Sequence, residues 1–158
     1  MVLPDLMKTI HLHADELAAE LMVDLRSNPR TKYLRGVGPE EFRRRALDLY
    51  ANLSTWIAGR REEDVASVYE ELGAARCAEG VSASELVWAL SLAKTHLLEF
   101  IRRNDSVTTS VELYQLGELM EMVERFFDRA VYHSLRGYEG MRGDYGRVQE
   151  PSAGVWCD

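Results

Sequence analysis

Apolar residues recur every three or four positions along almost the whole chain, which is the spacing of one face of an α-helix. The first such run lies within residues 3–26 and comprises Leu6, Ile10, Ala14, Leu17, Leu21 and Leu25. This pattern predicts a single first helix over residues 3–26. Because proline disfavours helix in the residue before it, the helix should stop within Ser27-Asn28-Pro29, and a short helical segment is expected near residues 31–34.

Two further helices are predicted in the middle of the chain. The segment Gly38-Pro39-Glu40-Glu41 is typical of a helix start, because proline suits the first helical position and acids favour the positive end of the helix dipole. This helix should end at Gly59. The next should begin at Glu62 and end near Gly80. Its inner face is expected to carry Val65, Val68, Tyr69 and Leu72.

Two capping boxes mark the starts of the last two helices. In each box, the hydroxyl of the first residue accepts from the backbone N–H of a glutamate three residues later, and the side chain of that glutamate accepts from the backbone N–H of the first residue. The two predicted pairs are Ser82 with Glu85 and Thr109 with Glu112. The last helix should run from Ser110 to about Tyr138. No strand pattern occurs, so the sequence predicts an all-α domain over residues 1–140 with a mobile tail over 141–158.

The last helix is apolar over more than one face. Leu113, Met122 and Phe126 lie away from the stripe that continues through Leu116 and Val123. A helix with such a wide apolar surface needs partners on two sides. One partner is its own domain, and we expect the other to be a second copy of the chain, which makes Leu113, Met122 and Phe126 candidates for the dimer interface.

Composition and charge exclude several classes of protein. The 158 residues suit one domain, and the formal net charge of −7 argues against a general nucleic-acid binder, which needs clustered Lys and Arg. One basic run, Arg43-Arg44-Arg45, is expected to be a solvated helix face because a helical period spreads it around the axis; a phosphate site there is the alternative.

Localisation is predicted from cysteine usage and apolar runs. Cys77 and Cys157 do not form a disulfide framework, which fits a reducing cytoplasm. Residues 1–10 lack the basic start and apolar core of a signal peptide. No apolar run is long enough to span a membrane. We therefore expect a cytoplasmic protein.

Motifs that would indicate catalysis or a metal site are missing from the sequence. There is no HExxH, GxSxG, GxGxxG or CxxC, and His11 and His13 are two apart on a helix and cannot share a metal. His96 lies beside an apolar stripe and is expected to be a partly buried histidine with one hydrogen bond. We expect no enzyme activity, no metal and no cofactor; an enzyme that uses the abundant carboxylates is the weakest alternative.

Aromatic residues offer the remaining candidate chemistry. Trp56, Tyr69 and Trp88 are candidates to line an interior pocket together with other aromatic residues. The simpler interpretation is that these side chains fill a hydrophobic core.

Several segments of the chain resemble a known family. They are Leu25–Thr31, Leu49–Trp56, Leu72–Leu86 and Phe126–Ala130, and their order and spacing are similar to those of the N-terminal domain of RsbR-type stressosome proteins, the RsbT co-antagonists. The resemblance covers residues 11–138. It implies a globin-like bundle of about five to six helices, a homodimer, and an input role in which a signal passes to an output partner such as a STAS protein or a histidine kinase. The chain is then either free-standing or a fragment.

The resemblance to globins also permits a test for haem. Haem-binding globin sensors carry the proximal histidine four residues before a glycine, and the matching position here is Arg76, four before Gly80. An always-charged guanidinium cannot ligate haem iron. We therefore expect a non-haem domain, with Arg76 paired to an acid such as Glu79 or Glu85. An anion or another small molecule near Arg76, or haem bound through His96, is the sensor alternative.

Overall fold

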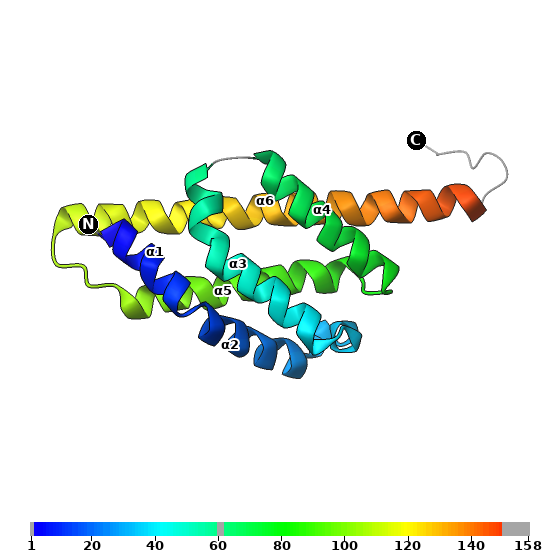
Figure 1. The fold of residues 1–158 in the computed structure, drawn as a ribbon, viewed down its shortest axis with the longest axis horizontal. Coiled ribbons are helices and arrows are strands. Elements are labelled where there is room, and N and C mark those ends of the chain that lie inside the picture. The colour runs from blue at the N-terminus through cyan, green and yellow to red at the C-terminus, as the bar shows by residue number, and fades with distance from the viewer. Residues whose placement is uncertain (1, 60–61, 150–158) are drawn as a thin grey trace.

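The computed structural model describes residues 2–59 and 62–149, and within them the regular secondary structure is helical, without strands. Figure 1 shows how the helices are arranged. They are α1 (Val2–Leu12), α2 (Ala14–Ser27), α3 (Pro39–Gly59), α4 (Glu62–Ala78), α5 (Ala83–Asn104) and α6 (Ser110–Gln149), with 3₁₀ turns η1 (Pro29–Thr31) and η2 (Tyr33–Gly36). The prediction of an all-α fold of five to six helices is confirmed, and the arrangement is consistent with a globin-like bundle.

The prediction of one helix over residues 3–26 was wrong, because the chain bends at His13. There φ is −103° and ψ is 16°, outside helical values. The backbone hydrogen bonds continue across the bend, from His13 N to Thr9 O and from Leu17 N to His13 O, both at 3.0 Å. The bend lets α1 pack on α3 and α6 while α2 packs on α3 and α5. Apolar spacing does not detect it because the buried stripe continues through both halves.

The predicted ends of the middle helices are confirmed. Helix α2 ends at Ser27, and Asn28 is extended, with ψ at 127°. Helix α3 begins at Pro39 and ends at Gly59, as the sequence predicts. After α4, Gly80 has a φ of +78°, a left-handed conformation that glycine adopts without the cost of a Cβ. The expected segment near residues 31–34 forms two 3₁₀ turns.

The two predicted capping boxes differ in outcome. At α6 both halves form, since Thr109 Oγ1 accepts from Glu112 N at 3.1 Å and Glu112 Oε2 accepts from Thr109 N at 3.0 Å. At α5 only the serine half forms, with Ser82 Oγ accepting from Glu85 N at 3.3 Å. The Glu85 side chain does not reach back to Ser82. It is only 8% exposed and crosses to the η2 turn, where Oε2 accepts from Tyr33 N at 2.9 Å and Leu34 N at 3.0 Å.

Replacing Glu85 by alanine should therefore lower the free energy of unfolding by about 2 kcal/mol, because the buried Leu34 N–H then loses a charged acceptor. Chemical denaturation measures this change. Glu85→Gln keeps an acceptor oxygen and should cost clearly less. Equal losses in the two variants would show that the carboxylate does not stabilise the turn through these bonds.

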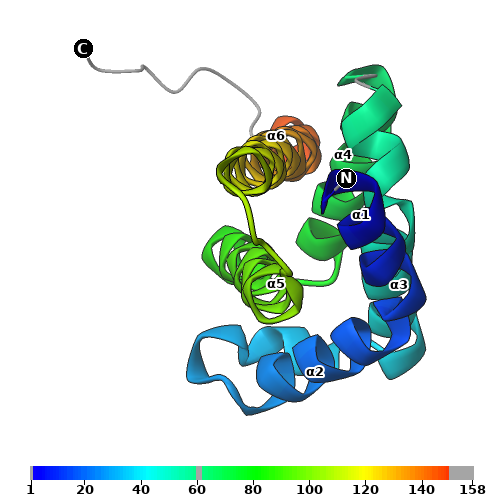
Figure 2. The ribbon, with the colours of Figure 1, turned by 90° about the vertical axis from the view of Figure 1, so that its left-hand side faces the viewer.

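Helix α6 lies at one corner of the bundle. It packs on α4 and α5, and α4 and α6 form the most extensive pair of helices. In Figure 2, which looks along α6, no other described helix covers its outer side. The helix was expected to end near Tyr138 but continues to Gln149. Residues 141–149 of the expected tail thus belong to α6, and residues 150–158 lie outside the described part of the chain. The mobility of residues 141–158 and the domain boundary at 140 stay predictions.

Candidate functional site

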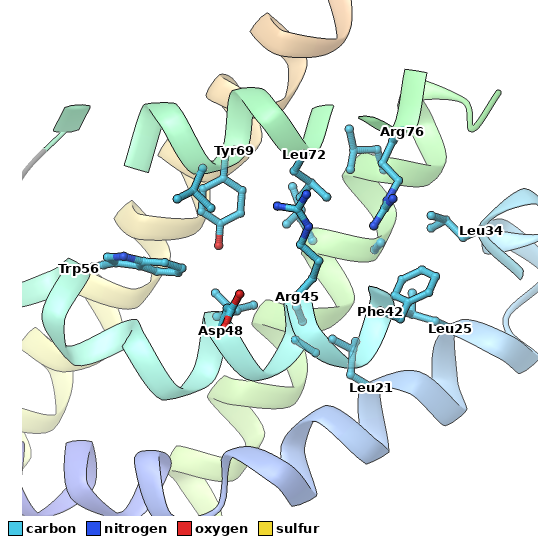
Figure 3. Close-up of a pocket in the computed structure, with 17 residues that line it drawn as sticks. Leu21, Leu25, Leu34, Phe42, Arg45, Asp48, Trp56, Tyr69, Leu72 and Arg76 are labelled. Atoms are coloured by element: carbon cyan, nitrogen blue, oxygen red, sulfur yellow. The ribbon is translucent and has the colours of Figure 1, made fainter. Parts of the chain in front are cut away.

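A cavity of about 90 Å³ lies between α3, α4 and α5, with α2 closing one side. Figure 3 shows the side chains that line it. Its walls are mostly aliphatic and aromatic, and its few polar groups come from α3 and α4. The lining residues are Leu21, Leu25, Leu34, Phe42, Arg45, Ala46, Asp48, Leu49, Trp56, Val68, Tyr69, Leu72, Arg76, Leu86, Ala89, Leu90 and Ala93.

Aromatic rings close one end of the cavity. Trp56 of α3 and Tyr69 of α4 meet edge to face, with ring centroids 5.9 Å apart. Behind them Phe126 of α6 stacks on Trp56 at 5.4 Å. Edge-to-face and offset-stacked pairs are favourable arrangements for aromatic rings. The cluster therefore fixes the ring of Tyr69 and joins the cavity wall to α6.

The Tyr69 hydroxyl is the polar group that points most plainly into the cavity (Figure 3). The residue is only 4% exposed. Burial raises the pKa of this hydroxyl well above the usual range for tyrosine, with nearby Tyr50 adding to the effect, so it stays a neutral donor at physiological pH. Tyr50, which is equally buried, donates to Ala93 O at 3.1 Å. Among the described residues Tyr69 has no such hydrogen-bond partner.

Arg76 lies at the other end of the cavity and is 2% exposed. Its Nη1 donates to Glu79 Oε2 at 2.7 Å, and its Nη2 is 3.7 Å from Glu41 Oε1. The guanidinium carbon is 5.6 Å from the centroid of the Phe42 ring, a cation–π distance. Of the two acids expected to pair with Arg76, Glu79 is the partner and Glu85 is not.

Arg45 of α3 joins the same network of charges. Its Nε donates to Glu41 Oε1 at 3.0 Å, and its Nη2 donates to Glu71 Oε1 at 3.1 Å. The hydrogen bond from Arg45 lowers the pKa of Glu41 although partial burial opposes it. Glu41 thus lies between Arg45 and Arg76 and links α3 to α4.

The basic run Arg43-Arg44-Arg45 was expected to lie on a solvated face. Arg43 and Arg44 are exposed, but Arg45 is half-buried at the cavity.

Trp88 and His96, two of the candidate site residues, do not line this cavity. Trp88 lies beside a separate surface depression with Ser82, and the guanidinium carbon of Arg30 is 4.4 Å from the centroid of its ring. His96 Nε2 donates to Asp24 Oδ2 at 2.9 Å. His96 is thus the partly buried, hydrogen-bonded histidine that the sequence suggested.

The three candidates for a dimer interface differ in their exposure to solvent. Leu113 is 61% exposed on α6. Met122 is partly buried and borders an open surface pocket beside Arg125. Phe126 is 0% exposed and belongs to the aromatic cluster of the core. Phe126 is therefore removed from the interface candidates, because its ring is already covered by Trp56 and Tyr69 of its own chain.

Two glycines that the sequence analysis did not single out bring α4 and α6 into backbone contact. A Cβ added at Gly73 would lie 1.8 Å from Ser134 O, and one at Gly137 would lie 2.0 Å from Glu70 O. Only hydrogen fits at either position. A glycine in the interior of each of two helices is the signal that could have indicated a close crossing.

The described residues hold no group of three or more His, Cys, Asp or Glu side chains arranged to bind a metal ion. In the same part of the chain, none of the helices has the length and apolar character needed to cross a membrane.

Comparison with models of protein families matches residues 14–151 to the RsbT co-antagonist protein rsbRD N-terminal domain. No curated protein and no solved structure matches the chain. The family match spans most of the chain, from α2 through α6, and includes the whole lining of the cavity.

Proposed function

This chain belongs to the family of RsbT co-antagonist protein rsbRD N-terminal domains, and we propose that it is a cytoplasmic, dimeric input domain that relays a signal to an output partner. The family is regulatory, which supports signalling rather than catalysis. By analogy with RsbR-type proteins, the partner is a stressosome component, a STAS protein or a histidine kinase. These partner classes follow from the resemblance of the sequence to RsbR-type proteins.

The observation that carries the proposal is the outer surface of α6. Four large apolar side chains on this helix are 59–69% exposed, and three of them lie in the first five residues of the helix. They are Val111, Leu113, Tyr114 and Tyr132. The same helix has no described neighbour on its outer side (Figure 2). A second copy that packs α6 against α6 would cover both surfaces at once, as a two-fold interface does.

Helix α6 also connects the interior of the domain with its far end. Its backbone contacts α4 at Gly73 and Gly137, while α4 supplies Tyr69 and Arg76 to the cavity wall. Because packed helices shift as rigid bodies, a change at the cavity moves α4 and, with it, α6. A helix of 40 residues rising about 1.5 Å per residue carries such a shift over about 60 Å.

We also propose that the domain works without haem. By its spacing to Gly80, Arg76 corresponds to the proximal histidine of haem-binding globin sensors, and it is already paired with Glu79. His96 is bonded to Asp24 and does not line the cavity. Adding hemin to the purified chain should therefore give no Soret band of a ligated haem, and His96→Ala should not change the spectrum. A Soret band that disappears in His96→Ala would contradict the proposal.

The mass of the chain in solution tests the dimer. Light scattering at tens of micromolar should give twice the chain mass of 18.0 kDa. The double variant Leu113→Glu/Tyr114→Glu places two like charges on each side of the interface and should give monomers that stay folded. Val23→Glu, at a residue 68% exposed on α2, is the matched control and should remain dimeric. A monomeric parent chain, or dissociation only in Val23→Glu, would refute this interface.

A further inference from the structure

We propose that the cavity between α3, α4 and α5 binds a small, neutral organic molecule that carries one hydrogen-bond acceptor, such as a short ketone or alcohol. Its occupancy would be the signal that the domain receives. This inference rests on the proposed input role but not on dimerisation.

Tyr69 supplies the donor for this acceptor. Its hydroxyl points into the cavity (Figure 3), and no described residue accepts its proton. A hydroxyl that faces a cavity makes its hydrogen bond with the occupant of the cavity, and an acceptor on a ligand can take the place of water there. The other buried tyrosine of the core, Tyr50, differs, because its hydroxyl donates to a backbone carbonyl, Ala93 O. The Tyr69 donor is thus left for an occupant of the cavity.

The charges around the cavity favour a neutral occupant. Two guanidiniums, of Arg45 and Arg76, line it, but both are already paired with carboxylates of Glu41, Glu71 and Glu79. An anionic ligand would have to displace these partners. The carboxylate of Asp48, which also lines the cavity, would repel an anion as well. A neutral ligand can bind with the network intact.

The volume limits the size of the ligand. An engineered cavity of about 150 Å³ in another protein holds benzene. By proportion to the six non-hydrogen atoms of benzene, the volume of about 90 Å³ here suits a ligand of about four non-hydrogen atoms. The apolar wall, including Leu72, Leu90 and Ala93, fits an aliphatic body rather than a polar one. For so small a ligand the dissociation constant is expected between about 0.05 and 10 mM.

Two probes of equal size test the ligand class. Acetone and acetate each have about four non-hydrogen atoms, the number that the cavity volume suits, and only acetate is charged. In ¹H–¹⁵N spectra of the full chain, acetone should shift the indole N–H signal of Trp56 saturably in the millimolar range. Acetate at the same concentrations should not. No saturable shift with acetone, or equal binding of acetate, would overturn the proposal.

Variants of the lining residues test the site. Tyr69→Phe removes one oxygen and should weaken acetone binding about tenfold, the value of one hydrogen bond. Tyr33→Phe, at a residue 63% exposed on η2, is the matched control and should bind like the parent. Ala89→Leu fills the cavity and should abolish binding, and Val68→Met offers a second way to fill it if that variant does not fold. Unchanged affinity in Tyr69→Phe would overturn the role of the hydroxyl.

The mass of the chain, measured on the same samples, separates this inference from the proposed function. A dimer that fails to bind acetone overturns only the ligand class. A monomer that binds it overturns the interface on α6 and leaves the ligand site standing.

Discussion

Gly137→Ala should lower the free energy of unfolding by about 3 kcal/mol or more, a large effect for the addition of one methyl group. The new Cβ would lie 2.0 Å from Glu70 O, 2.6 Å from Glu70 C and 2.7 Å from Glu70 Cα. All three atoms belong to the backbone of α4, so no side chain can rotate away. The two helices would have to separate, and the core between them would lose its packing. Chemical denaturation measures the loss.

Gly140→Ala is the matched control, three residues further along the same helix. A Cβ at Gly140 would meet no atom within 4 Å. Alanine is the better helix former, so this variant should be stabilised by up to about 1 kcal/mol. If Gly137→Ala were as stable as Gly140→Ala, the close crossing of α4 and α6 would be wrong. The relay from the cavity to α6 would then lose its structural basis.

Phe126→Ala should cost about 3–5 kcal/mol, because it removes a fully buried ring and leaves a cavity. The ring is 0% exposed and contacts Trp56, Tyr69 and Phe127, with centroid distances of 5.4–5.9 Å. The loss should appear in the denaturation of the chain at any protein concentration. An interface residue would instead show a loss that depends on concentration.

The control for Phe126→Ala is Val23→Ala, which changes a side chain 68% exposed on α2. It should change the free energy of unfolding by no more than about 0.5 kcal/mol. A small effect of Phe126→Ala, comparable with this control, would return Phe126 to the surface and to the list of interface candidates.

The sequence predicted well those helix boundaries that depend on one residue. Pro39 and Gly80 act through the local conformation of their own backbone, so their effect can be inferred without knowing any neighbour. The bend at His13 is different, because it depends on which helices the two halves pack against. It leaves both the apolar spacing and the backbone hydrogen bonds in place.

The contacts of individual side chains were predicted less well, because these contacts form between segments that are distant in the sequence. Glu85 fits a capping box by its spacing, yet its carboxylate binds backbone N–H groups 51 and 52 residues away. Phe126 was expected off the main stripe of α6, but it lies three residues after Val123 on the same buried face, and Trp56 of α3 covers it.

The candidate site was predicted in part. The pocket candidates Trp56, Tyr69 and Arg76 line one cavity, whereas Trp88 lies elsewhere. Arg45 was missed because its neighbours Arg43 and Arg44 are exposed and the run looked uniformly solvated.

The distance between α6 helices in the assembled protein tests the central claim most directly. A spin label at Gly117→Cys, an exposed position where a Cβ meets no atom within 4 Å, would report on α6 in a Cys77→Ser/Cys157→Ser background. Because paired helices pack 8–10 Å apart, labels on two copies should be on the order of 20 Å apart. A label at Val23→Cys on α2 should give a longer distance. No coupling between Gly117 labels, or a short distance only between Val23 labels, would contradict a dimer that transmits its signal through α6.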